Sequence, residues 1–221
     1  MEIARAAAGL FMSRGLRATR AEDIAQAAGI APRTFYRYFA TKEEAVAPLY
    51  AAGAQRWAEA VRYAPGDLSV PQALEHAVRH TLTPGLGVSA SSWERLRTLI
   101  RLALTDPALR KVWAEVCRGS EETLGEILAG RVRSSRAGDG GDNVAGGSES
   151  LEFAPGSGDS ESPELAPGTP RFTAAVASAA VRVAVEVWAE GDAPPAGPGG
   201  PAELALRHLA ALRGFEWGSG G

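Results

Sequence analysis

The chain has 221 residues, which is enough for two small domains or one large one, and 45% of them are apolar, which is enough to form a buried core. A formal net charge of −3 argues against a protein that coats nucleic acid without selectivity. The single cysteine, Cys117, excludes an intramolecular disulfide framework and a zinc site built from several cysteines, and it fits a reducing compartment.

Targeting and membrane signals are not visible in the sequence. The first residues, MEIARAAAGLF, carry charges where a secretory signal needs an uninterrupted apolar core. No apolar run approaches the ~18 residues of a membrane span. We therefore expect a soluble cytoplasmic protein with no membrane partner.

Residues 1–50 predict a series of short helices. The first is carried by EIARAAAGLFMSRG, in which Ile3, Ala7, Leu10 and Phe11 form an apolar stripe at helical spacing. Gly15 then allows the left-handed backbone that ends a helix.

A second and a third helix follow, separated by a glycine turn. Thr19 and Glu22 have the spacing of a capping box that starts the second helix, residues 21–28. A proline at the first position suits the third helix, residues 32–39, because its missing N–H needs no partner there. Two short helices joined by a glycine turn are the layout of a helix-turn-helix.

The third predicted helix divides into faces at about 100° per residue. The inward face consists of Phe35 and Phe39, the outward face of Arg33, Thr34 and Arg37, and the two shoulders of Tyr36 and Tyr38. Such an outward face suits the major groove of duplex DNA, because arginine can donate two hydrogen bonds to guanine and a threonine methyl can touch a thymine methyl. Tyrosine hydroxyls on the shoulders can reach phosphates, which set the register of the protein on DNA.

Three flanking residues are candidates for further backbone contacts. Lys42, at the start of the next helix, combines a point charge with a helix N-terminus. Thr19 and Arg20, at the start of the second helix, are placed to hold the opposite strand. All eight predicted DNA contacts therefore lie between positions 19 and 42.

The run ARAAAGLFMSRGLRATRAEDIAQAAGIAPRTFYRYFATKEEAV resembles the DNA-binding domain of the TetR family of transcriptional regulators. The resemblance lies in F-x-x-x-G-L, T-x-x-E-D-I-A-x-A-A-G and T-F-Y-R-Y-F-x-x-K-E-E. It implies that the second and third helices form the helix-turn-helix, that Arg33, Thr34, Tyr36 and Tyr38 face the groove, and that Lys42 contacts a phosphate. One departure is Ala31, which stands where the family usually has a small hydroxyl cap.

Further helical patterns make the expected fold all-α, with a DNA-binding domain at residues 1–45 and a helical ligand-binding and dimerisation domain at 46–217. The expected helices after the first three cover about residues 42–63, 71–82, 91–104, 107–132, 171–190 and 201–214. Residues 134–170 hold seven acidic residues and one arginine among many Gly, Ser and Pro residues. This composition predicts a disordered acidic insertion between two helices.

The runs SSWERLRTLIRLALTDPALRKVWAEV and AAVRVAVEVWAEGD are similar to the C-terminal domain of a TetR subgroup associated with acyl-CoA-like ligands. This resemblance makes the domain a candidate for binding a small effector. The predicted pocket residues are the wall residues Trp57, Trp93, Trp113 and Cys117 and the headgroup-binding residues Arg97 and Arg101. A different effector class, such as cationic drugs, stays open, and an ordinary core or surface role for each residue does too.

The helix at 171–190 has two apolar stripes and needs two packing partners. One stripe is formed by Val176, Ala180, Val183 and Val187, and the other by Val181, Val185 and Trp188. One stripe suits the core and the other suits a second subunit. The predicted dimer interface consists of Val181, Val185, Trp188, Leu206 and Leu209.

Catalytic and metal-binding signals are weak. His76 and His80 have a spacing that can hold a metal, but no third ligand stands at a telling distance. We expect no metal, no cofactor and no enzyme activity. The sequence thus predicts a homodimeric repressor that binds a palindromic DNA operator and is released by a small effector, with a drug-responsive regulator or an activator as the alternative. A helical enzyme or ligand carrier that does not bind DNA is a more distant one.

Overall fold

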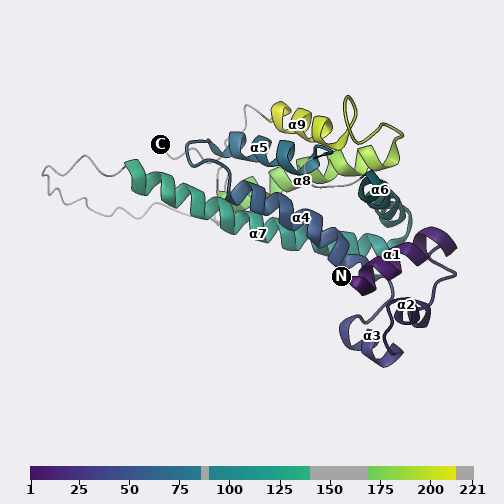
Figure 1. The fold of residues 1–221 in the computed structure, drawn as a ribbon. Coiled ribbons are helices and arrows are strands. Elements are labelled where there is room, and N and C mark those ends of the chain that lie inside the picture. The colour runs from purple at the N-terminus through teal and green to yellow at the C-terminus, as the bar shows by residue number, and fades with distance from the viewer. Residues whose placement is uncertain (86–89, 140–168, 213–221) are drawn as a thin grey trace, which may run out of the picture.

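The computed structural model describes residues 1–85, 90–139 and 169–212, and within these ranges every regular element is a helix (Figure 1). The all-α fold class is therefore confirmed. The elements are α1 (Glu2–Arg14), α2 (Ala21–Ala27), α3 (Pro32–Tyr38), the 3-10 turn η1 (Glu44–Val46), α4 (Ala47–Arg62), α5 (Val70–Leu82), α6 (Ala90–Thr105), α7 (Pro107–Asp139), α8 (Pro170–Glu190) and α9 (Pro201–Ala211).

Helices α1, α2 and α3 form a small body at one end of the molecule (Figure 1). Each helix contributes buried apolar side chains to a shared centre, including Phe11 of α1, Ile24 of α2 and Phe35 of α3. The turns between the helices depend on glycine, because Gly15 has φ +83° and Gly29 has φ +69°, in a region that residues with a Cβ rarely adopt.

The start of α2 differs from the predicted capping box. The backbone N–H of Arg20 donates to Asp23 Oδ2 at 2.8 Å, whereas the Thr19 hydroxyl donates back to the Gly15 carbonyl at 2.9 Å. The position that caps α2 is therefore Arg20, one residue later than predicted. Thr19 lies outside α2, and its hydroxyl instead supplies a hydrogen bond to the carbonyl of Gly15, the residue that follows α1.

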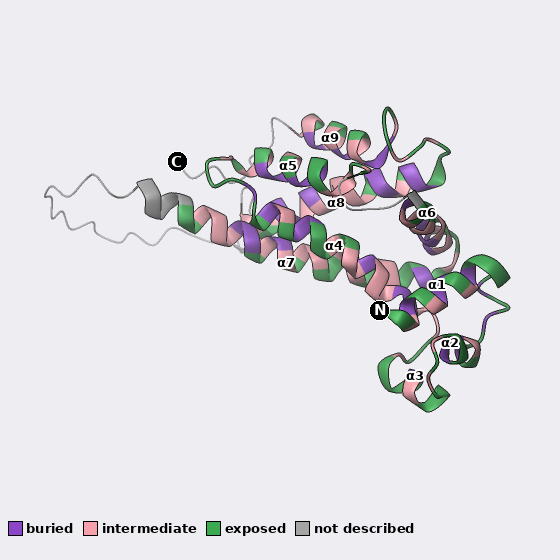
Figure 2. Ribbon diagram, viewed as in Figure 1, coloured by how far each residue is buried: buried purple, intermediate pink, exposed green. Residues whose placement is uncertain are grey.

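The larger body is built on α7, the longest helix, with α4 and α8 packed along it (Figure 1). Helices α5 and α9 cover the other side of α4 and α8, and α6 crosses the end of α8 nearest α1. One core cluster runs from Phe11 and Phe35 through Tyr50 of α4 to Trp93 and Trp188, and a second lies between α4, α5, α7, α8 and α9. The two bodies therefore share one apolar core. Figure 2 shows buried residues in both bodies.

Several predicted boundaries move. The predicted helix at 42–63 begins with the turn η1 and continues as α4. The predicted insertion begins at residue 134, but α7 continues to Asp139. The remaining residues of the insertion, 140–168, lie outside the described residues. The predicted helix at 201–214 ends earlier, at Ala211, and residues beyond 212 are not described.

Helix α8 is long and apolar enough to cross a membrane by length and composition alone, with a mean hydropathy of 1.4 over its most apolar window. The sequence prediction of no such run is therefore wrong for residues 170–190. In the structure α8 packs against α6, α7 and α9, and Trp188 is buried there. This packing is typical of a core helix in a water-soluble domain.

Candidate nucleic-acid interface and internal cavity

Helix α3 presents one buried and one exposed face. Phe35 is fully buried, and its ring packs edge-on against Tyr36 at 5.5 Å and tilted against Phe39 at 5.6 Å between ring centroids. Arg33 and Arg37 lie on the exposed face. Because Phe35 fixes the rotation of a helix only two turns long, it also fixes the direction of the two arginines.

The end of α3 differs slightly from the prediction. Phe39 is extended rather than helical and is half-buried, so α3 ends at Tyr38. At the other end, Ala31 offers no side-chain cap and Pro32 opens the helix, as the sequence predicts. The amide of Phe39 still donates to the Phe35 carbonyl at 3.0 Å, which closes the last turn.

The two tyrosines of α3 are held on its flanks. Tyr36 is 52% exposed and donates to Glu22 Oε1 of α2 at 3.3 Å, and Glu22 also pairs with Arg20 at 3.6 Å. Partial burial, and after it the Glu22 carboxylate, raise the pKa of Tyr36 above its ordinary value. Tyr38 is 62% exposed and lies under the Arg37 guanidinium, 5.1 Å from the ring centroid.

Two of the predicted DNA contacts are engaged inside the protein. Thr19 is fully buried, so its side chain is not on the surface, and we leave it out of the candidate interface. Lys42 donates to the carbonyls of Leu16 at 2.7 Å and Thr19 at 2.8 Å, and its side chain is 24% exposed. The ammonium thus ties the chain after α3 to the turn between α1 and α2, and this positioning role could not be seen from sequence spacing.

A cavity of about 550 Å³ lies in the larger body, between α4, α6, α7 and α8. Three predicted pocket residues line it, namely Trp57, Trp113 and Cys117. Burial raises the pKa of the Cys117 thiol to about 12, so the thiol is neutral at physiological pH. The thiol therefore adds no charge to the cavity wall.

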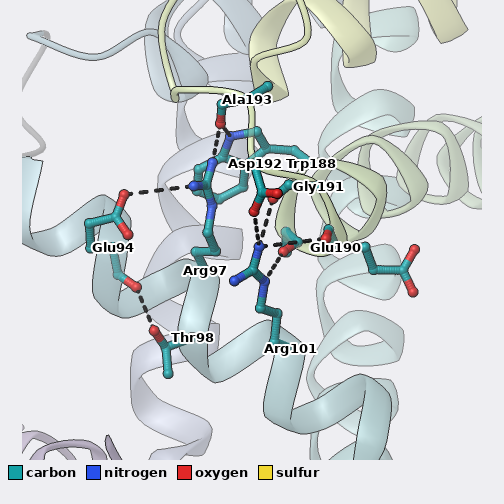
Figure 3. Close-up of polar contacts among 10 residues, drawn as sticks. Glu94, Arg97, Thr98, Arg101, Trp188, Glu190, Gly191, Asp192 and Ala193 are labelled. Carbon is teal, nitrogen blue, oxygen red and sulfur yellow. Dashed lines mark hydrogen bonds and ion pairs between the residues drawn. The ribbon is translucent and has the colours of Figure 1, made fainter.

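The other predicted pocket residues lie elsewhere. Arg97 and Arg101 of α6 close the C-terminal end of α8 and the chain beyond it (Figure 3). Arg97 donates to the Ala193 carbonyl and stacks on the Trp188 ring at 4.3 Å, and Arg101 donates to the carbonyls of Ala189 and Gly191. The prediction of a headgroup site is wrong for both arginines, because the unpaired carbonyls at a helix C-terminus attract them first.

Trp93 belongs to the same corner rather than to the cavity. Its ring meets Trp188 edge-on, with 5.5 Å between centroids, and it is 2% exposed. The prediction of a pocket wall is wrong for Trp93 too, because its ring packs α6 against α8.

The two stripes of α8 are used in the opposite way from the prediction. Val185 and Trp188 are buried in the core and Val181 lines the cavity, so these residues are not available to a second subunit. Instead, Val183 is 39% exposed and Val187 is 46% exposed. The larger ring of Trp188 makes its stripe the one that gains most from burial.

Helix α9 changes the predicted interface further. Leu209 is 5% exposed and packs in the core, whereas Leu206 is half-buried and lies at the edge of the core. Leu209 is therefore a core residue and the predicted interface contact is wrong there.

Some cavity residues were not predicted. Arg182 and Glu186 of α8 form an ion pair at 3.0 Å, and Glu186 also accepts from Trp113 Nε1 at 2.7 Å. Their spacing of four residues shows the pair in the sequence but does not show that it borders a cavity. Ser178 and Arg110 line the cavity as well, and no sequence signal marks either.

Comparison with known proteins identifies the small body. Residues 3–47 match the family described as "Bacterial regulatory proteins, tetR family". The chain is 30% identical over 139 residues to the HTH-type transcriptional regulator TcmR of Streptomyces glaucescens, which covers 62% of this chain and 59% of that regulator. The match thus spans less than two thirds of the relative.

Two solved structures share the fold over nearly the whole chain. FadR of Thermus thermophilus, a TetR-family repressor in complex with lauroyl-CoA, superimposes with a TM-score of 0.54 at 21% identity and covers 96% of this chain and 91% of its own. The multidrug binding protein EbrR, in complex with imidazole, gives a TM-score of 0.52 at 18% identity and covers 96% of this chain and 92% of its own. At these identities the likeness concerns the fold alone.

Proposed function

We propose that this chain, whose residues 3–47 match the tetR family of bacterial regulatory proteins, is a homodimeric repressor that binds a palindromic DNA operator and is released by a small effector. The observation that carries the proposal is the exposed face of α3. Arg33 and Arg37 stand on a short helix that is anchored by the buried Phe35 ring. This arrangement gives two solvated guanidinium groups a fixed direction, which reading the edges of base pairs requires.

The contacts divide by chemistry. Arg33, Thr34 and Arg37 reach base edges, where arginine pairs with guanine. Tyr36, Tyr38 and Arg20 reach phosphates and fix the register. Lys42 acts by holding the turn between α1 and α2 in place. The exposed part of its side chain faces the phosphate backbone of the DNA.

The second subunit packs on the exposed stripe of α8. Val183 and Val187 are exposed apolar side chains one turn apart, whereas Val176 and Ala180, further along the same line, are half-buried against the second core cluster. A two-fold dimer through this stripe buries the same patch of both subunits. It also presents two α3 helices to successive major grooves about 34–36 Å apart.

The cavity is placed to couple an effector to DNA binding. Tyr50 of α4 lines the cavity and also belongs to the core cluster that contains Phe11 and Val46. Its hydroxyl donates to the Leu99 carbonyl of α6 at 2.8 Å, and its ring meets Trp113 of α7 at 5.1 Å. A ligand that moves Tyr50 therefore shifts α4 and α6 against α1, and the two binding equilibria are linked.

The alternatives differ in effector and in sign. FadR binds an acyl-CoA and EbrR is a multidrug binding protein, and both have this fold, so the fold does not choose between these classes. An activator uses the same DNA contacts. An enzyme or carrier without DNA binding is less well supported, because it gives the exposed arginines of α3 no role.

Selection of bound duplexes from a random library by the purified protein tests the proposal. We expect enrichment of one sequence with two-fold symmetry, whose half-sites lie about one helical turn apart. Recovery of unrelated duplexes only, or of none, contradicts a sequence-specific regulator.

A further inference from the structure

The cavity between α4, α6, α7 and α8 also indicates which molecules fit it. We infer that it takes an uncharged, largely apolar molecule that carries a hydrogen-bond acceptor. The inference rests on the proposed function only in giving that molecule a regulatory role. It follows from the walls, the charges and the hydrogen-bond donors of the cavity.

The walls are mainly apolar and come from these four helices and from Leu82, the last residue of α5. The aliphatic residues among them are Leu82, Leu96, Ile100, Leu104, Val116 and Val181. Trp57, Trp113 and Tyr50 add aromatic surface. A volume of about 550 Å³ is typical of a site for one small organic molecule.

The charges around the cavity are balanced or lie at its edge. Arg182 pairs with Glu186, and Arg118, which is 60% exposed, pairs with Glu115 and with Glu122 at 2.8 Å. A charged ligand would lose its hydration to meet groups that already have partners.

Two lining residues complete the charged rim. Arg110 is exposed and donates to the Leu104 carbonyl. The other is Glu121 of α7. The lining therefore holds three arginines and two glutamates, and water screens the attraction that the exposed Arg110 offers to an anion.

Two polar groups of the lining residues lack a hydrogen-bond partner in the part of the chain that the structure describes. They are the indole N–H of Trp57, on α4, and the hydroxyl of Ser178, on α8. Both atoms are covered by their neighbours. Trp57 is 5% exposed overall, and an indole N–H can only donate. A buried donor without an acceptor costs free energy, which an acceptor on the ligand recovers.

The two donors differ in how they can be satisfied. The Ser178 side chain can turn about one bond to reach the cavity, and it can equally turn to the carbonyl four residues earlier in α8. The Trp57 N–H lies on a rigid ring that is packed in the second core cluster, so it cannot turn to another acceptor in the same way. A ligand acceptor such as a carbonyl oxygen therefore bonds to Trp57, with Ser178 in support.

Four naphthalene compounds test the inference, because they share one ring system and differ in one substituent. They are naphthalene, 2-acetylnaphthalene, 2-naphthoate and 2-naphthylmethylammonium. In isothermal titration of the full chain we expect the ketone to bind tightest, about threefold to tenfold tighter than naphthalene, which is the effect of one neutral hydrogen bond. Tighter binding of either ion than of the ketone, or no binding of any of the four, overturns the inference.

Variants of the donors make the test specific. In Trp57→Phe the preference for the ketone over naphthalene should fall towards one, and in Ser178→Ala it should fall less. Cys117→Ala removes a neighbouring group of the same cavity and should leave the preference unchanged. The inference fails if neither donor variant alters the preference, or if Cys117→Ala alters it as much as Trp57→Phe.

DNA binding by the same preparations separates the two proposals. Sequence-specific DNA binding without any preference for the ketone supports the proposed regulator and contradicts the ligand inference. Ketone binding through Trp57 without DNA binding keeps the cavity assignment and removes the regulator.

Discussion

The arginines of α3 and those of α6 resemble one another in sequence and differ in the structure. Arg33 and Arg37 are exposed, and Arg37 touches only the neighbouring Tyr38 ring and hydroxyl among the contacts of the described residues. Arg97 is 9% exposed and, with Arg101, closes the C-terminal end of α8 (Figure 3). An arginine is thus available to a ligand only where the fold brings no carbonyl to it.

The largest expected effect lies at the α6 corner. Arg97→Ala removes the guanidinium that stacks on the Trp188 ring and one of two donors to the Ala193 carbonyl, the other being Trp188 Nε1 at 3.1 Å. It should lower the free energy of unfolding by about 2–3 kcal/mol. Chemical denaturation measures the loss. Arg56→Ala, an exposed arginine of α4, is the matched control and should change stability by less than about 0.5 kcal/mol. Equal stability of the Arg97 and Arg56 variants contradicts the capping role.

The α3 surface should show the reverse behaviour. Arg33→Ala and Arg37→Ala should each weaken binding to the selected duplex by about 1–3 kcal/mol, because a bidentate contact to a base is lost, while stability stays within about 0.5 kcal/mol. Fluorescence anisotropy of labelled duplex measures the affinity. If both variants bind as tightly as Arg56→Ala, the exposed arginines do not read the operator.

The two faces of α8 extend the comparison to apolar residues. Val187→Asp places a charge on the exposed stripe and should weaken dimerisation by about 2 kcal/mol or more without unfolding the subunit. Val185→Ala, on the buried stripe, should instead lower stability by about 1–2 kcal/mol and leave the dimer intact. Light scattering across a concentration series separates the outcomes, and an unchanged dimer in Val187→Asp removes this stripe from the interface.

The smallest expected effect concerns Cys117. Because the folded thiol has its pKa raised from 9.0 to about 12, the unfolded chain loses this proton first as the pH rises, and stability should fall between these two values. The fall should be about 1 kcal/mol per pH unit at most, since the thiol is only partly shielded from water. Comparing the free energy of unfolding of the wild type with that of Cys117→Ala at pH 8 and pH 10 isolates the contribution of the thiol. Identical pH dependence contradicts a buried thiol.

The small body could be predicted closely because its signals are local. Gly15 and Gly29 mark turns that need positive φ, and the split of α3 into faces follows from helical periodicity alone. Thr19 and Lys42 could not be placed in this way. Their hydrogen bonds depend on the turn between α1 and α2, and Lys42 reaches it from 23 and 26 residues away.

The larger body shows where periodicity gives no answer. Both stripes of α8 are apolar, so only the neighbours decide which is buried, and those neighbours are α6, α7 and α9. Tertiary neighbours also decide the roles of Arg97 and Arg101, because their carbonyl acceptors lie about 90 residues further along the chain. The sequence pattern around the two arginines could not show this. Trp57 and Trp113 line the cavity and Trp93 does not, although the sequence predicts all three on the same grounds, because the packing of α6 on α8 uses Trp93.

The most direct test of the central claim is a hydroxyl-radical footprint of the selected duplex with the wild-type chain and with Arg37→Ala. The account predicts two protected patches in the wild type, related by two-fold symmetry and separated by about one helical turn, and the loss of both patches in the variant at the same protein concentration. Protection of a single patch, or equal protection by both proteins, would contradict a dimer that reads DNA through α3.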